Sequence, residues 1–169
     1  MFDKFGEFDS AEELNRAAAA QRDEGDEEAL VALALENGID REDAEDFMDR
    51  VPGAEELCTT YMAALGKLKV EKEELELKRE LQDLAEEVET ECQTNEAVAA
   101  GVRRKGKSLA TYLAKIIDAG YKNAILIPAE ITREVKEVPA QYRNQIRTGM
   151  PSKAERLDIM RNYYGEVTG

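Results

Sequence analysis

Histidine and tryptophan are absent from the 169 residues, and cysteine occurs only twice. Without histidine the chain has no imidazole to serve as a general acid, a general base or a metal ligand. Cys58 and Cys92 stand in no metal-binding or redox spacing, so we expect two buried thiols in a reducing compartment. The sequence also lacks a G-x-S-x-G nucleophile motif and the twelve-residue loop of a calcium site. It therefore predicts a protein that is not an enzyme and that uses no metal and no cofactor.

Long apolar runs are missing as well. A membrane-spanning helix needs about 18 or more consecutive apolar residues, and no such run occurs. The opening residues, Met1–Glu7, are charged and lack the apolar stretch of a secretory signal. Apolar residues still make up 43% of the chain, which is enough to form a core. We therefore expect a folded cytoplasmic protein that makes no membrane contact.

Negative charge is present in excess and is unevenly distributed. Residues 1–100 hold 30 acidic and 10 basic side chains, whereas residues 101–169 hold 7 acidic and 13 basic ones. The net charge of −14 therefore combines a strongly acidic part with a basic one. This division indicates one surface for a basic partner and another for an acidic partner. The alternative is that the acidic half folds against the basic half, so that the charges partly cancel.

Local signals place helices in the first third of the chain. Ser10-Ala11-Glu12-Glu13 is a capping box that starts a helix running to about residue 24. A second helix is predicted over residues 27–37, and a third opens at residue 40. Residues 9–50 therefore indicate a compact three-helix module. Val51-Pro52-Gly53 then marks a boundary between two domains, residues 1–52 and 53–169.

Beyond this boundary the pattern predicts a helix over residues 54–65 and a long helix from about Val70 to Cys92. An apolar stripe covers one face of the long helix, and carboxylates dominate the opposite face. Carboxylates spaced about 5–6 Å apart along a helix can imitate the phosphate row of a nucleic acid. Such a face could occupy a cationic groove that normally binds DNA or RNA. The predicted partner-binding residues on this acidic face are Glu73, Glu76, Glu80, Asp83 and Glu87.

The last third of the chain is predicted to form a helical core. Ser108 caps an amphipathic helix that ends at Gly120 and turns Leu113 and Ile117 inward. The apolar run 125–127 could be a strand, but we expect it to pack ahead of a helix over residues 128–138. A second capping box at residues 152–155 opens the last helix. The predicted fold is thus all-α, with an N-terminal three-helix module, a long acidic helix and a C-terminal helical core.

Residues 101–108 match the G-x-x-x-x-G-K-[ST] pattern of a nucleotide-binding loop. Such a loop should follow a hydrophobic strand, whereas residues 94–100 are rich in alanine and typical of a helix. A second strand that ends in a magnesium-binding aspartate is also missing. We therefore interpret the match as a hinge between two helices that can bind an anionic group without hydrolysing it. The candidate anion-binding residues are Arg103, Arg104, Lys105 and Lys107.

Several stretches are similar to a known family. They are residues 2–13, 36–40, 63–71 and 102–109, together with the closing Pro151…Ala154…Tyr163-Tyr164. These stretches resemble the PcfK-like proteins, small acidic proteins carried by mobile elements of gut Firmicutes. Some members are identified as anti-CRISPR inhibitors of the type II RNA-guided nuclease. The resemblance implies that residues 105–109 start a core helix rather than bind a nucleotide, and residues 125–150 match least well.

Three functions follow as hypotheses. In the first, the protein is a phage or mobile-element inhibitor in the bacterial host cytoplasm. It would bind a type II CRISPR effector nuclease, with or without guide RNA, in its nucleic-acid channel. In the second, it is a nucleic-acid-binding accessory protein of a conjugative element, and residues 101–169 make a weak contact with phosphates. In the third, it is a nucleotide-hydrolysing enzyme.

Overall fold

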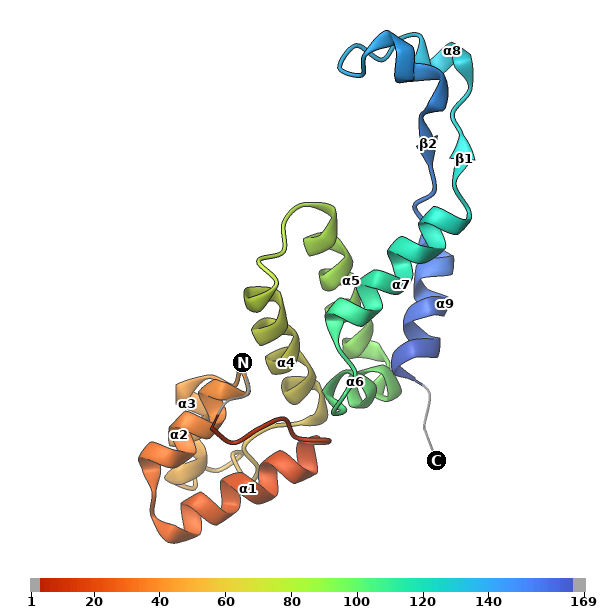
Figure 1. The fold of residues 1–169 in the computed structure, drawn as a ribbon. Coiled ribbons are helices and arrows are strands. Elements are labelled where there is room, and N and C mark those ends of the chain that lie inside the picture. The colour runs from red at the N-terminus through yellow and green to blue at the C-terminus, as the bar shows by residue number, and fades with distance from the viewer. Residues whose placement is uncertain (1–3, 166–169) are drawn as a thin grey trace.

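The computed structural model describes residues 4–165 and confirms that the fold is all-α (Figure 1). Residues 1–3 and 166–169, at the ends of the two predicted domains, lie outside the described residues. No helix within residues 4–165 is both long and apolar enough to cross a membrane. In chain order, the elements are α1 (Ala11–Glu24), α2 (Glu27–Glu36), α3 (Arg41–Met48), α4 (Thr60–Glu74), α5 (Glu80–Thr94), α6 (Glu96–Arg103), α7 (Leu109–Lys122), β1 (Ile125–Leu126), α8 (Ala129–Thr132), the 3-10 helix η1 (Ala140–Gln145), β2 (Arg147–Thr148) and α9 (Lys153–Tyr164).

The three-helix module at the N-terminus is confirmed. The Ser10 side chain accepts a hydrogen bond from the Glu13 amide and starts α1, and Asp26 caps α2 in the same way. The Glu13 carboxylate accepts from the Asp9 amide, one residue before the position that a capping box predicts. α1, α2 and α3 enclose an N-terminal cluster. This cluster includes Leu14, Leu30, Leu33, Phe47, Leu57 and Cys58.

The two helices predicted over residues 54–65 and 70–92 have the wrong bounds, because the observed helices are α4 over Thr60–Glu74 and α5 over Glu80–Thr94. Residues 49–59 form a loop, and the Thr59 side chain caps α4 by accepting from the Met62 amide at 3.2 Å. α4 runs through Gly66, past the end predicted at residue 65. A Cβ at residue 66 would lie 2.2 Å from the Asn37 carbonyl oxygen, so glycine is required for α4 to approach the end of α2. α4 thereby joins the module to the remainder of the fold.

The long acidic helix is wrong, because the chain reverses between α4 and α5. Glu76 and Arg79 adopt positive φ angles of 47° and 53°, a conformation that non-glycine residues adopt at a cost. The reversal brings Leu84 and Val88 of α5 against Leu68 of α4 in one buried cluster. A continuous helix would carry these side chains away from α4. Tertiary packing therefore overrides the helix propensity of residues 75–79.

The C-terminal helical core consists of α4 to α7 and α9. Its central residues are Leu68, Leu84, Val88, Val102, Leu109, Tyr112, Ile116, Met160 and Tyr164. The predicted burial of Leu113 is confirmed at 5% exposure. The predicted burial of Ile117 is wrong, since its side chain is 57% exposed. α7 buries the face that carries Leu109, Tyr112, Leu113 and Ile116, and Ile117 lies outside that face. α7 also continues past Gly120 to Lys122.

Residues 123–151, which we call the arm, project from the helical body (Figure 1). β1 and β2 pair antiparallel, with Ile125 opposite Thr148 and Leu126 opposite Arg147. The strand, which was the less favoured alternative for the apolar run 125–127, therefore forms over Ile125–Leu126. The helix predicted over residues 128–138 is wrong, because α8 ends at Thr132. The chain then continues through a turn and η1, which buries none of its own residues.

The two buried clusters meet along α4. Ala63 belongs to the N-terminal cluster, whereas Ala64 belongs to the C-terminal one. Residues 51–53 are exposed, but Leu57 and Cys58 beyond them pack into the N-terminal cluster. The division into domains 1–52 and 53–169 stays a prediction.

Candidate functional site

Four of the five predicted acidic residues gather at the end of the α4–α5 hairpin. Glu73 lies in the last turn of α4, Glu76 in the connecting turn, and Glu80 and Asp83 in the first turn of α5. All four side chains are exposed. We call these four residues the acidic tip. Lys78 and Arg79 of the same turn offset part of its charge.

The fifth residue, Glu87, has a different environment. It binds Arg156 of α9 through two hydrogen bonds, of which that from Nε measures 2.9 Å. The Arg156 guanidinium lowers the pKa of the Glu87 carboxyl. One turn further along α5, Glu91 accepts from Arg161 at 2.8 Å. Along this part of α5, acidic residues of the first 100 positions therefore pair with basic residues of α9. This is the alternative in which the acidic half of the chain folds against the basic half.

The four candidate anion-binding residues do not form a common cationic surface. Arg103 is fully buried and donates to the Asn37 side-chain oxygen at 2.8 Å. The Lys107 ammonium donates to the Tyr163 carbonyl at 2.7 Å and lies 4.7 Å from the centre of the Tyr163 ring. Arg104 is half-buried, and Lys105 alone of the four has an exposed side chain.

The turn formed by residues 104–107 does bind anionic groups, and they come from the chain itself. The Lys105 amide donates to the Asp9 carboxylate at 3.1 Å, and the Gly106 amide donates to the Glu7 carboxylate at 3.4 Å. These are the kinds of backbone donors that a nucleotide-binding loop presents to phosphate. α6 leads into the turn, where a nucleotide-binding loop would follow a strand. The geometry is that of a structural junction.

Lys67, which sequence reasoning missed, holds this junction together. Its side chain is fully buried and makes an ion pair with Glu7. The same ammonium donates to the carbonyl oxygens of Arg104 at 2.9 Å and Lys107 at 2.6 Å. The N-terminal segment, α4 and the 104–107 turn thus meet at one buried charge. A signal was present in the sequence, because Lys67 follows Ala63 and Ala64 at the spacing of a buried helix face.

Both thiols are buried, as expected from the sequence. Burial raises the pKa of Cys58 to about 11 and that of Cys92 to about 12. Neither is therefore a thiolate near neutral pH. Within residues 4–165, no three histidine, cysteine or carboxylate side chains are grouped so that they could hold a metal ion.

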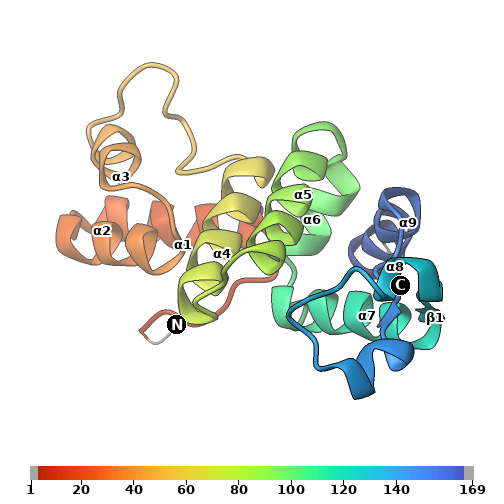
Figure 2. The same cartoon turned by 90° about the horizontal axis from the view of Figure 1, so that it is seen from above.

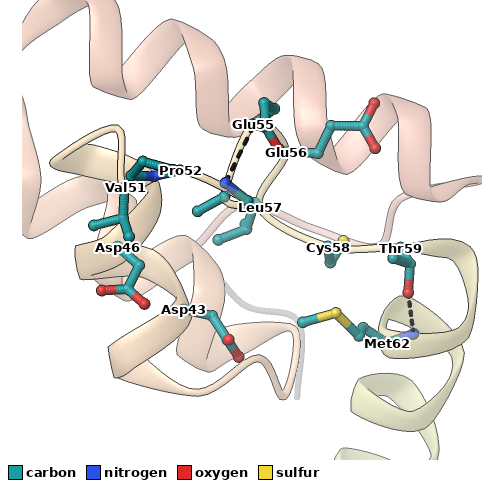
Figure 3. A pocket seen from close by; sticks show the side chains of 12 residues that line it. Asp43, Asp46, Val51, Pro52, Glu55, Glu56, Leu57, Cys58, Thr59 and Met62 are labelled. Carbon is teal, nitrogen blue, oxygen red and sulfur yellow. Dashed lines mark hydrogen bonds between the residues drawn. The ribbon is translucent and has the colours of Figure 1, made fainter.

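A cavity of about 640 Å³ opens beside the loop that joins α3 to α4 (Figure 3). Asp43 and Asp46 of α3 line it together with Glu55 and Glu56 of the loop. Its apolar lining includes Val51, Leu57 and Met62, and no lysine or arginine contributes to it. We call this cavity the acidic pocket. Its chemistry suits a side chain or segment that is both cationic and apolar.

Comparison of the chain with protein-family models, curated proteins and solved structures finds no match.

Proposed function

We propose that the protein is a stoichiometric inhibitor of a type II RNA-guided DNA nuclease. The acidic tip would bind in the cationic nucleic-acid channel of the nuclease, which normally holds a guide–target heteroduplex. The observation that carries the proposal is the placement of Glu73, Glu76, Glu80 and Asp83, all exposed, around one projecting hairpin end. The resemblance to the PcfK-like family supplies the class of partner.

The shape of the hairpin supports this mode of binding. A helix with its side chains is about 10–12 Å wide, so two packed helices present an end roughly 20 Å across. That width is comparable to a nucleic acid duplex. The carboxylates would therefore be presented by a body that fits a duplex channel, although they do not form a row along one helix. Many weak charge contacts of this kind steer association and make it dependent on salt.

Phosphate binding by the 104–107 turn receives less support. Arg103 is buried, Lys107 is engaged with Tyr163, and the Lys105 and Gly106 amides are occupied by Asp9 and Glu7. The accessory-protein hypothesis therefore loses most of the cationic turn, where only the Lys105 side chain is exposed.

A DNA-cleavage assay with a purified type II effector tests the proposal. The protein is added before or after guide loading, at a series of salt concentrations. We expect inhibition that weakens steeply with salt and that is lost in a quadruple variant with all four acidic-tip residues changed to lysine. A matched control carries the same charge change at exposed sites elsewhere and should still inhibit: Glu24→Lys, Asp118→Lys, Glu134→Lys and Asp158→Lys.

Circular dichroism should show that both quadruple variants remain helical. Equal inhibition by the parent and the acidic-tip variant would exclude the tip as the binding surface. Absence of inhibition by the parent in either order of addition would refute the proposed function.

A further inference from the structure

The arm exposes apolar side chains to an extent that the helical body does not. Exposed large hydrophobic residues concentrate here, and Tyr121 at the end of α7, 88% exposed, adds to them. Those of the arm itself are Ile125, Leu126, Ile131, Tyr142 and Met150. Within the arm, Thr132 and Pro151 are the buried positions, so the arm has no apolar core of its own. A short two-stranded ribbon is at best marginally stable in water, and contiguous exposed apolar surface marks interaction sites.

The charge of the arm narrows the class of partner. Arg133 and Lys136 are exposed and make no ion pair with any residue that the structure describes. Residues 123–151 contain four basic and three acidic side chains, whereas the whole chain has a net charge of −14. With four basic side chains against three acidic ones, the arm has a net charge of only +1 and attracts nucleic acid or an anionic membrane weakly. The arm therefore suits a protein surface that is hollow, partly apolar and locally acidic.

The protein itself carries such a surface in the acidic pocket. Val51, Leu57 and Met62 supply its apolar lining. Asp46 and Glu56 are exposed there and form no ion pair among residues 4–165. Residues of α3 and of the loop that follows it line the pocket. Figures 1 and 2 show α3 at the end of the molecule opposite the arm. The arm of one molecule cannot reach the pocket of the same molecule.

We propose that the arm of one copy docks into the acidic pocket of a second copy. Because the two surfaces lie at opposite ends, an antiparallel pair related by a twofold axis makes two equivalent arm–pocket contacts. In each contact Arg133 and Lys136 face Asp46 and Glu56, and exposed apolar side chains of the arm cover the apolar lining of the pocket. The association goes beyond the proposed inhibition, since it involves neither the acidic tip nor a nuclease.

Sedimentation velocity of the full chain over a concentration series tests the proposal. We expect a reversible dimer. The parent and its variants are compared at one fixed salt concentration, because salt screens both the arm–pocket attraction and the repulsion between two chains of net charge −14. The arm variant Arg133→Glu/Lys136→Glu and the pocket variant Asp46→Lys/Glu56→Lys should each be monomeric. An equimolar mixture of the two should dimerise again, because each reversed arm then meets a reversed pocket. The double reversal Lys78→Glu/Lys105→Glu, outside both surfaces, should leave the dimer intact.

Several outcomes would overturn the proposal. The first is that the parent protein stays monomeric at millimolar concentration. The second is that the arm variant and the pocket variant both still dimerise. A mixture of the variants that remains monomeric would exclude pairing of these two surfaces. The arm variant should also be compared with the parent for binding to duplex DNA and to anionic lipid vesicles. If the arm mediates either binding while the parent stays monomeric, its partner is not a second copy.

Discussion

Replacing Lys67 by methionine should destabilise the protein more than any change to an exposed lysine. Methionine keeps most of the apolar length of the side chain but removes the charge. The Glu7 carboxylate would lose its ion pair, and the Arg104 and Lys107 carbonyls would lose a donor. Breaking a buried ion pair by removing one partner costs about 3–5 kcal/mol. Because the Glu7 side chain keeps 24% exposure, water can reach it, and we expect a loss of about 3 kcal/mol.

Lys69 provides a matched control on the same helix. Its ammonium lies 3.1 Å from the Asp40 carboxylate, but the two side chains are 54% and 75% exposed. Exposed ion pairs contribute about 0–1 kcal/mol, so the free energy of unfolding of Lys69→Met should lie within about 1 kcal/mol of that of the parent. Urea denaturation followed by far-ultraviolet circular dichroism measures both free energies of unfolding. The comparison holds when the slope of the unfolding free energy against urea concentration is the same in the parent and the variants.

Amide hydrogen exchange adds a local measurement. If Lys67 orders the 104–107 turn, the Lys105 and Gly106 amides should exchange faster in Lys67→Met than in Lys69→Met. Equal free energies of unfolding for the two variants, with unchanged exchange at these amides, would refute the reasoning. The turn would then be held without the buried ammonium.

Three further predictions follow from the same structure. Nucleotide binding, measured by calorimetry, should be absent from the parent and unaffected by Lys107→Ala; micromolar binding that this change removes would show a true nucleotide site. Leu113→Ala should lower the free energy of unfolding by about 2–5 kcal/mol, whereas Ile117→Ala should lower it by under about 0.5 kcal/mol; equal losses would contradict their different burial. Arg156→Gln should destabilise the protein at neutral pH, because it removes the guanidinium that lowers the pKa of the Glu87 carboxyl in the folded state. The ionised carboxylate stabilises the folded parent, and this contribution is lost as the pH falls through the lowered pKa. In urea denaturation the difference from the parent should therefore shrink below about pH 4, and a difference independent of pH would contradict the assignment.

The elements that could be predicted from the sequence are those with local causes. Ser10, Ser108 and Ser152 each cap the helix that the sequence assigned to them. A cap acts on amides two or three residues away, so its signal lies within a few residues. The three-helix module followed from such caps. Gly25 and Gly38, with positive φ angles of 73° and 71°, follow the first two helices, and glycine adopts this conformation without strain. The four acidic-tip residues were predicted as part of a row on one long helix; their side chains are exposed, but they lie around a helical hairpin.

The reversal between α4 and α5 could not be predicted in this way. Residues 75–79 contain no proline or glycine, and the apolar stripe from Leu77 onward continues the helical period. The chain turns there because Leu84 and Val88 pack against α4, which is a contact between segments distant in sequence. The pairing of Glu87 with Arg156 is equally non-local. Strands of two residues, as in the arm, are too short to show a period at all.

The match to a nucleotide-binding loop has a physical cause that needs no nucleotide. Gly106 has a φ of 78°, which glycine adopts without strain, and Ser108 caps the helix that follows. A phosphate-binding turn requires the same two features, because its amides must also converge ahead of a helix. Here the converging amides receive Glu7 and Asp9, and the turn carbonyls receive the ammonium of Lys67. The sequence pattern therefore identifies the geometry of the turn. It does not identify the anionic group that the turn amides bind, which here comes from the N-terminal segment of the same chain.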